Sequence, residues 1–379
     1  MNYLELHKHF KENSLFGRYI TLDSITPLLS KYETRIIGQS VLGKPIYSLT
    51  IGTGKTRIFM WSQMHGNEST TTKALFDFLN VIHSDNEIGA KLLSEFTFCI
   101  LPMVNPDGAE LYTRENANKI DLNRDSIDLS QPESQLLFQT FKEFKPDFCY
   151  NLHDQRTIFG VGATKNPATV SFLAPSYNEN RDVNEVRSKA MTVIVAMNDE
   201  LQKYIPNQVA RFDDGFNINC IGDRFTSLDV PTILFEAGHF PDDYYREFTR
   251  KMIFIALISG LKDIYENDVV DDKKAKYLQI PKNNIVFYDF IYKNVKINYD
   301  GKEIITNFAA QYKEELFEGK IQFNAYIVEI GELKGKIGHF QYNAHKMLYL
   351  DEFDSLPKIN QKANFCLGKD IKFVNGLKK

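Results

Sequence analysis

Short apolar runs alternate with segments of helical apolar spacing over residues 35–265. In several runs the apolar residues are continuous, as expected of strands that are buried on both faces of a sheet. The helical segments place apolar residues three or four positions apart, which forms a stripe that can pack on a sheet. This alternation predicts an α/β sheet with helices on its faces. The predicted strands are 44–51, 57–61, 96–104, 147–153 and 231–238, and the predicted helices are 74–82, 133–144 and 246–265.

The pattern changes after a charged stretch at 266–277, which lacks a sustained apolar period. The later runs are rich in β-branched and aromatic residues, and Asp300-Gly301 between two of them is a strong hairpin signal. We therefore predict a large α/β domain over residues 1–268 and a small, mostly β accessory domain over 278–379. The charged stretch is the predicted linker between them.

Composition narrows the class of protein. The chain has 45 basic and 49 acidic residues, a formal charge of −4, so it has no global attraction to nucleic acid or to an anionic membrane. No stretch approaches the roughly 20 apolar residues of a membrane span. Four widely spaced cysteines and the lack of an apolar leader favour a reduced, cytoplasmic protein. His7 and His9 have a metal-like spacing, but their charged surroundings predict a solvated helix instead.

Three ligand-type side chains follow or end predicted strands. His65 and Glu68 come just after the strand at 57–61, and His153 ends the strand at 147–153. A catalytic zinc ion usually takes three protein ligands from His and Asp or Glu. In open α/β sheets, sites gather at the carboxyl ends of strands. These residues are therefore candidate zinc ligands, although polar residues that cap a helix and a loop histidine would give the same pattern.

The segment at 105–125, "NPDGAELYTRENANKIDLNRD", adds a specific likeness. With the His-Gly-Asn-Glu motif before it, and strands ending in Leu-His and Phe-Glu after it, the chain resembles the zinc carboxypeptidases of the carboxypeptidase A superfamily over roughly residues 35–240. The resemblance implies a mixed, largely parallel sheet with helices on both faces. It also implies one zinc ion, bound by His65, Glu68 and His153.

The resemblance also implies roles for five further residues. Asp121 orients a ligand histidine, and Asn123 with Arg124 holds a terminal carboxylate of the substrate. Arg114 stabilises the oxyanion. Glu236 accepts a proton from the attacking water and passes it to the leaving amine.

Three departures from the family pattern leave the substrate open. Asn67 stands where an arginine is often found, and no tyrosine occurs between Tyr204 and Glu236, where the family has a mobile one; Phe212 or Phe216 is the nearest substitute. The specificity pocket is expected near 216–225, where Asp223 resembles a family aspartate. Its other residues give conflicting indications, an apolar pocket from Ile221 and Gly222 and an acidic preference from Arg224.

Three functions follow from these residues. The first is a zinc metallocarboxypeptidase that cleaves an amide bond next to a free C-terminal carboxylate. The second is a zinc amidase or deacylase that acts on N-acyl amino acids or cell-wall peptides. The third is a zinc-binding module without catalysis, which Glu236 and Arg114 argue against. The substrate is thus a peptide or an N-acyl amino acid, and the oligomeric state is left open.

Overall fold

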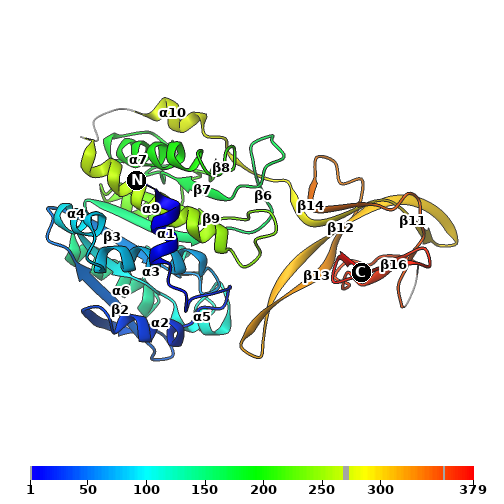
Figure 1. Ribbon diagram of the computed structural model, residues 1–379, viewed down its shortest axis with the longest axis horizontal. Coiled ribbons are helices and arrows are strands. Elements are labelled where there is room, and N and C mark those ends of the chain that lie inside the picture. Colours follow the sequence, from blue (N-terminus) through cyan, green and yellow to red (C-terminus); the bar gives the residue numbers. More distant parts are fainter. Residues whose placement is uncertain (1, 268–272, 353–354) are drawn as a thin grey trace. The chain divides into compact units, whose positions relative to one another are not determined.

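The computed structural model describes residues 2–267, 273–352 and 355–379, which fall into two units (Figure 1). The larger unit comprises Met1–Arg156 and Ala168–Asn283, and the smaller comprises Thr157–Pro167 and Asn284–Lys379. The predicted linker at 266–277 includes residues 268–272, which lie outside the described residues. The chain thus passes into the smaller unit twice, first as a short segment that begins three residues after the end of the strand of His153.

The larger unit is built on an eight-stranded mixed sheet. Parallel pairing joins β4, β3, β5 and β9 at its centre and β7 with β8 at one edge, whereas β1, β2 and β7 bring in antiparallel pairs. The prediction of a mixed, largely parallel sheet is confirmed. In sheet order the strands are β1 (Thr34–Gln39), β2 (Pro45–Ile51), β4 (Phe96–Leu101), β3 (Thr56–Ser62), β5 (Phe148–Asp154), β9 (Thr232–Ala237), β7 (Val170–Leu173) and β8 (Val209–Arg211).

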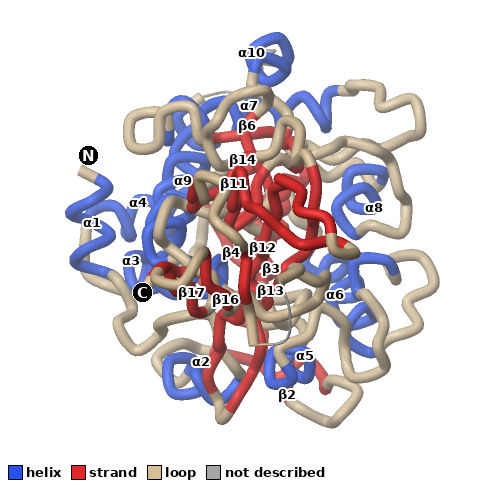
Figure 2. The backbone as a smooth tube through the Cα atoms, turned by 90° about the vertical axis from the view of Figure 1, so that its right-hand side faces the viewer, coloured by secondary structure: helices blue, strands red, loops and turns tan. Residues whose placement is uncertain are grey.

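Helices cover both faces of this sheet (Figure 2). Alternate residues of β3 enter two different cores: Ile58 and Met60 pack with α3, α7 and α9, and Phe59 and Trp61 pack with α6 and α8. None of the helices in the described ranges is long and apolar enough to cross a lipid bilayer. The helices are α1 (Tyr3–Phe10), α2 (Leu22–Leu29), α3 (Thr70–His83), α4 (Glu87–Glu95), α5 (Pro106–Leu111), η1 (Leu122–Arg124), α6 (Pro132–Phe144), α7 (Glu185–Leu201), α8 (Ile221–Ser227), α9 (Glu247–Glu266) and α10 (Lys274–Gln279).

The first helix, α1, exposes His9 as its charges predict, but it buries His7. The His7 side chain is 3% exposed, and its Nε2 lies 3.1 Å from Asp77 Oδ2. Asp77 is itself fully buried and binds the Arg250 guanidinium through both carboxylate oxygens, at 2.7 and 2.6 Å. The prediction for His7 was therefore wrong, because a buried carboxylate on another helix gives this histidine a polar partner inside the core.

The ion pair between Glu247 and Lys73 predicts how the stability of the protein depends on pH. Glu247 pairs with the fully buried Lys73 at 2.6 Å and with Lys11 at 2.9 Å. Burial would raise the pKa of Glu247, but these ammonium groups outweigh it and lower that pKa to about 2. An unfolded glutamate has a pKa of about 4.3. The stabilisation is thus complete above the unfolded pKa, and it is lost as the pH falls toward 2.

We expect Glu247→Gln to lower the free energy of unfolding at pH 7 by about 3 kcal/mol, because it leaves Lys73 buried without its charged partner. The variant should also lose less stability than the wild type between about pH 5 and pH 2. Urea unfolding at several pH values measures both effects. Glu185→Gln is the control, because Glu185 pairs with Lys189 at the surface, where solvent screens the pair, and its loss should leave stability and its pH dependence close to those of the wild type. Equal pH dependence in Glu247→Gln and the wild type would contradict the prediction.

The smaller unit consists mainly of two four-stranded sheets with an aromatic core. Asp300 and Gly301 both have positive φ, +48° and +77°, in the turn between β11 and β12, as the hairpin signal predicts. The first sheet has the order β13 (Lys320–Gly331), β12 (Lys302–Phe317), β11 (Phe287–Tyr299) and β14 (Ile337–Asn343). The second has the order β15 (Tyr349–Leu350), β16 (Phe365–Leu367), β17 (Ile371–Val374) and β18 (Leu377–Lys378), and β6 (Phe159–Val161) pairs separately with β10 (Asn283–Ile285).

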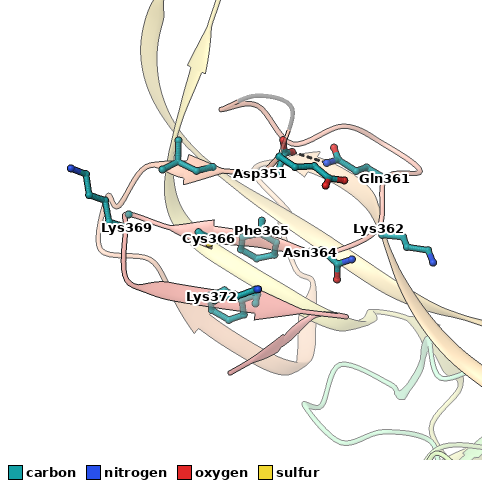
Figure 3. A pocket seen from close by; sticks show the side chains of 12 residues that line it. Asp351, Gln361, Lys362, Asn364, Phe365, Cys366, Lys369 and Lys372 are labelled. Atoms are coloured by element: carbon teal, nitrogen blue, oxygen red, sulfur yellow. Dashed lines mark hydrogen bonds between the residues drawn. The ribbon is translucent and has the colours of Figure 1, made fainter.

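The second sheet carries a hollow of about 720 Å³ in the smaller unit (Figure 3). Successive side chains of its strands point to opposite faces. Phe365 and Phe373 also belong to the aromatic core, whereas Asn364, Cys366 and Lys372 occupy the neighbouring positions along the strands. One side of this sheet is therefore apolar and packed, and the hollow combines polar side chains with apolar ones such as Leu350.

Candidate metal centre and active site

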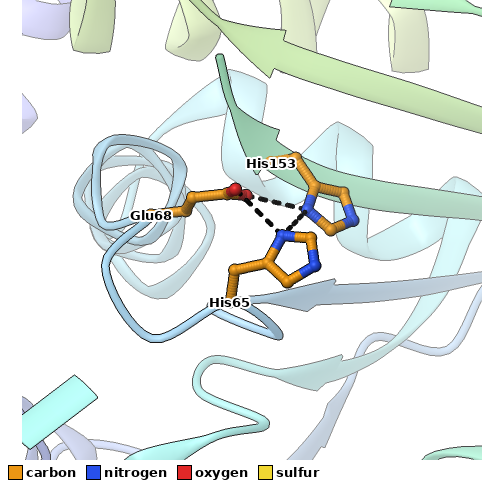
Figure 4. A group of neighbouring side chains, drawn as sticks. All are labelled: His65, Glu68 and His153. Atoms are coloured by element: carbon orange, nitrogen blue, oxygen red, sulfur yellow. Dashed lines mark hydrogen bonds and ion pairs between the residues drawn. The ribbon is translucent and has the colours of Figure 1, made fainter. Parts of the chain in front are cut away.

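The candidate ligands come from two neighbouring parallel strands. His65 and Glu68 lie in the short loop between the end of β3 and the start of α3, and His153 lies at the end of β5 (Figure 4). Because β3 and β5 are paired in parallel, their carboxyl ends meet at one edge of the sheet. The next strand, β9, pairs with β5 so that Glu236 lies opposite His153. Sheet topology thus brings residues from three distant parts of the sequence to one place.

The three candidate ligands converge closely. Glu68 Oε1 lies 2.9 Å from His65 Nδ1, and Glu68 Oε2 lies 2.8 Å from His153 Nδ1. The two Nδ1 atoms are only 3.1 Å apart. One ligand atom from each residue fits within 4.8 Å of the others, and all three residues are buried. The polar atoms of these side chains therefore point at a common centre, as Figure 4 shows.

This donor set fits a zinc ion. Two imidazole nitrogens and one carboxylate form a set that catalytic zinc sites use, which leaves a further coordination position open. Two Nδ1 atoms that face each other at 3.1 Å cannot both donate to the other, whereas both can donate a lone pair to a cation between them. A cation bound between these atoms would account for the crowding of acceptor atoms in a buried place.

Asp121 holds His65 from the opposite side of its ring. Its Oδ1 lies 3.0 Å from His65 Nε2, so Nε2–H donates to the carboxylate and Nδ1 keeps its lone pair toward the cluster. Burial would raise the pKa of Asp121, but the hydrogen bond from His65, the charge of Arg114 and the Asn123 backbone N–H lower it well below its usual value. Asp121 also accepts hydrogen bonds from the Asn123 backbone N–H, at 2.9 Å, and from Arg114 Nε, at 3.1 Å.

Arg114 lies between two carboxylates of the site. Its Nη1 is 3.3 Å from Glu68 Oε1, while its Nε contacts Asp121 Oδ2. The side chain is 42% exposed, so the guanidinium is held in place yet remains open to solvent. A fixed positive charge beside the candidate ligands can interact with negative charge that develops on a bound substrate.

Glu236 is buried and incompletely bonded. It is 9% exposed, and among the described residues nothing hydrogen-bonds to its Oε2. Burial raises the pKa of Glu236 well above its usual value, the negative charges of Glu68 and Asp154 raise it further, and Arg114 opposes them. A buried carboxyl group with a free oxygen and a raised pKa has the properties of a group that takes up a proton.

Asn123 and Arg124 lie on η1 and contact the start of α8. The Asn123 side-chain oxygen accepts a hydrogen bond from the Ile221 backbone N–H at 2.9 Å. Arg124 Nη1 donates to the Asn123 carbonyl at 2.7 Å and to Cys220 Sγ at 3.1 Å. Among the described residues no carboxylate pairs with Arg124, which is exposed.

The region expected to form a specificity pocket is partly closed. Ile221 is 2% exposed, and a Cβ on Gly222 would lie 3.0 Å from the Pro175 ring. Asp223 is 6% exposed, and burial raises its pKa to about 7. The Arg224 guanidinium lies 5.9 Å from the centre of the Phe138 ring, and Phe138 packs against the core.

Sequence reasoning missed the residues behind the candidate ligands. Asp154, next to His153, donates its backbone N–H to Glu68 Oε2 at 3.1 Å. Arg18 reaches the Asp154 carboxylate at 2.8 Å from the N-terminal segment. The only sequence signal for Asp154 as a supporting residue is its position next to His153. No sequence motif indicates such a role for Arg18.

Comparisons with known proteins agree on one family. Residues 26–205 match the family described as zinc carboxypeptidase. "Probable carboxypeptidase 2" of Trichophyton verrucosum is 29% identical over 113 residues, which are 30% of this chain and 21% of that protein. "Gamma-D-glutamyl-L-diamino acid endopeptidase 1" of Lysinibacillus sphaericus is 39% identical over 83 residues, 20% of this chain and 21% of that protein. The chain thus spans about a fifth of the length of these relatives.

A solved structure shows the same fold. The metallo-carboxypeptidase from Burkholderia cenocepacia superposes with a TM-score of 0.53 at 17% sequence identity, over 65% of this chain and 69% of that one. The matched share of this chain is close to the share that its larger unit occupies.

Proposed function

We propose that this chain, whose larger unit belongs to the zinc carboxypeptidase family, is a zinc-dependent peptidase that cleaves the amide bond next to a free C-terminal carboxylate. The observation that carries the proposal is the convergence of His65, Glu68 and His153 beside the buried carboxyl group of Glu236. These three side chains would hold the ion. Bound zinc supplies Lewis acidity, which polarises a carbonyl group and makes water more acidic.

Glu236 moves the proton in the proposed reaction. Its unpaired Oε2 can accept a proton from the attacking water, whose oxygen forms the new bond to the scissile carbon. The same carboxyl group then gives that proton to the leaving nitrogen as the carbon–nitrogen bond breaks. The products are a shortened acid and a free amine, and Glu236 returns to its starting state.

Arg114 stabilises the negative charge that develops on the carbonyl oxygen. Its guanidinium is oriented by Asp121 and Glu68 before substrate binds, so little reorganisation is needed during the reaction. This pre-orientation supports a role in catalysis.

Asn123 and Arg124 bind the free carboxylate of the substrate. A guanidinium can hold a carboxylate through two parallel hydrogen bonds, and Arg124 has no carboxylate partner of its own among the described residues. The Asn123 carboxamide is fixed by the Ile221 N–H, which supports a directional contact beside the charge.

The proposed exopeptidase action predicts a preference for acid over amide substrates. Because a charge-assisted hydrogen bond contributes about 1.5–3 kcal/mol, amidation of the substrate's C-terminus should lower kcat/KM roughly 10- to 100-fold. The Arg124→Ala enzyme should no longer distinguish acid from amide. Measuring both substrates with both enzymes forms a double-mutant cycle, in which general damage from the substitution cancels.

Arg35→Ala is the matched control for this cycle, since Arg35 is also exposed but lies on the edge strand β1. It should keep the wild-type preference. Equal wild-type rates on acid and amide would contradict exopeptidase action.

A second candidate function is supported by one comparison. Over 83 residues the chain is 39% identical to a protein named as an endopeptidase for gamma-D-glutamyl-L-diamino acid bonds. An amidase acting on such cell-wall peptides, or on N-acyl amino acids, would use the same His65, Glu68, His153 and Glu236. Equal rates on acid and amide in the cycle above would favour this candidate.

A further inference from the structure

The N-terminal segment before α2 packs behind the loop that carries His65 and Glu68. Gln63, two residues before His65, donates to the Ile20 carbonyl at 2.8 Å, and Ser69, directly after Glu68, donates to the Arg18 carbonyl at 2.6 Å. Both donors are fully buried. The ligand loop is thus fixed on each side by a segment that lies outside the residues 26–205 matched by the zinc carboxypeptidase family.

Arg18 connects this segment to both sources of candidate ligands. Its Nη1 donates to Asp154 Oδ2 at 2.8 Å and to the Thr70 hydroxyl at 2.7 Å. The side chains of Arg18 and Asp154 are only 5% and 2% exposed. Thr70 begins α3, two residues after Glu68, and Asp154 directly follows His153.

Asp154 completes the connection. Its Oδ2 also accepts from the Thr70 backbone N–H at 3.0 Å, and its Oδ1 accepts from the Thr71 N–H at 3.3 Å, so the carboxylate caps the first turn of α3. Its own N–H donates to Glu68 Oε2. The end of β5 and the start of α3 are therefore joined by one buried carboxylate, and Arg18 is its charged partner.

We propose that Arg18 is a positioning residue for the metal centre, which acts through Asp154 and Thr70 to fix Glu68 and His153 relative to each other. Without the guanidinium, Asp154 keeps its two backbone donors but loses its charged partner, so the two ligand-bearing segments are held less firmly. The inference rests on the metal assignment of the proposed function. A purely structural ion pair would instead contribute to fold stability and leave the ligands in place.

The test measures metal binding rather than turnover. Zinc affinity is obtained by competition with a chromogenic chelator, and ligand geometry from the visible absorption of the cobalt-substituted protein. For Arg18→Gln we expect a zinc Kd raised roughly tenfold, the lower end of the range for loss of a partner that orients a ligand, together with a changed cobalt spectrum. Arg18→Lys should lie between, because the shorter ammonium keeps the charge but reaches fewer of the acceptors.

The control is Arg187→Gln, which removes another buried guanidinium from an ion pair, with Asp214 at 2.8 Å, on α7. It should lower stability and leave zinc affinity and the cobalt spectrum unchanged. If Arg18→Gln loses stability yet binds both metals like the wild type, the positioning role is excluded.

If Arg18→Gln does not fold, Arg18→Lys decides, and a wild-type Kd and spectrum in that variant would overturn the proposal. Failure of the wild-type protein to bind zinc would count against the proposed function itself, so the two failures are distinguishable.

Discussion

Replacing Glu236 with glutamine is expected to reduce kcat by about 10² to 10⁴ while zinc stays bound. This is the range for loss of general acid–base catalysis, and the amide cannot accept the proton of the attacking water. Glu236 lies opposite His153 in the sheet but outside the converging ligand atoms, so the substitution removes no predicted ligand. Steady-state kinetics with a good peptide substrate, beside metal analysis of the same protein, measures both parts of the prediction.

The variant should also be at least as stable as the wild type. When it acts as a base, Glu236 carries a buried negative charge, whereas glutamine is neutral and similar in shape. A folded, zinc-loaded Glu236→Gln enzyme with a near-wild-type rate would show that another group accepts the proton.

Much of the central sheet could be predicted because its middle strands are buried on both faces. The continuous apolar runs at β3, β4, β5 and β9 stand out for this reason, and each of these predicted strands is present. β7 and β8 were missed, since they have only four and three residues and carry no period that separates them from loops. α7 was also missed, although it has 17 residues, because buried positions are spread around much of its surface.

The candidate ligands could be predicted from the sequence, whereas the residues that support them could not, for a physical reason. Chemistry restricts the ligands to a few residue types at strand ends, so His65, Glu68 and His153 can be found from motif and order, and the structure brings them together. The groups that support them are less restricted. Any cation that reached Asp154 could do what Arg18 does, and only the path of the folded chain brings residue 18 there.

The same limit explains the segment Thr157–Pro167. It follows the strand of His153 by three residues, yet it belongs to the smaller unit, where the Ile158 carbonyl accepts hydrogen bonds from the Val286 and Phe287 N–H groups. These contacts join residues more than 120 positions apart through backbone atoms. Backbone hydrogen bonds leave little trace in side-chain pattern, so the sequence predicts an accessory domain but not this contribution to it.

The second large effect is expected from the ligand set itself: His153→Ala should lose zinc and activity but keep its fold. The substitution leaves two of the three candidate ligands, so zinc affinity should fall by more than the about 10- to 100-fold that follows loss of an outer hydrogen-bond partner. The fold should persist, because a large apolar core supports the unit and the ion is not its main source of stability. After dialysis against a chelator and return of zinc, the wild type should regain activity and His153→Ala should not.

His83→Ala is the matched control, since His83 is exposed at the end of α3 and its replacement should leave zinc binding unchanged. A His153→Ala protein with wild-type zinc content and affinity would remove His153 from the ligand set, and with it the reason for placing the reaction at the ends of β3 and β5.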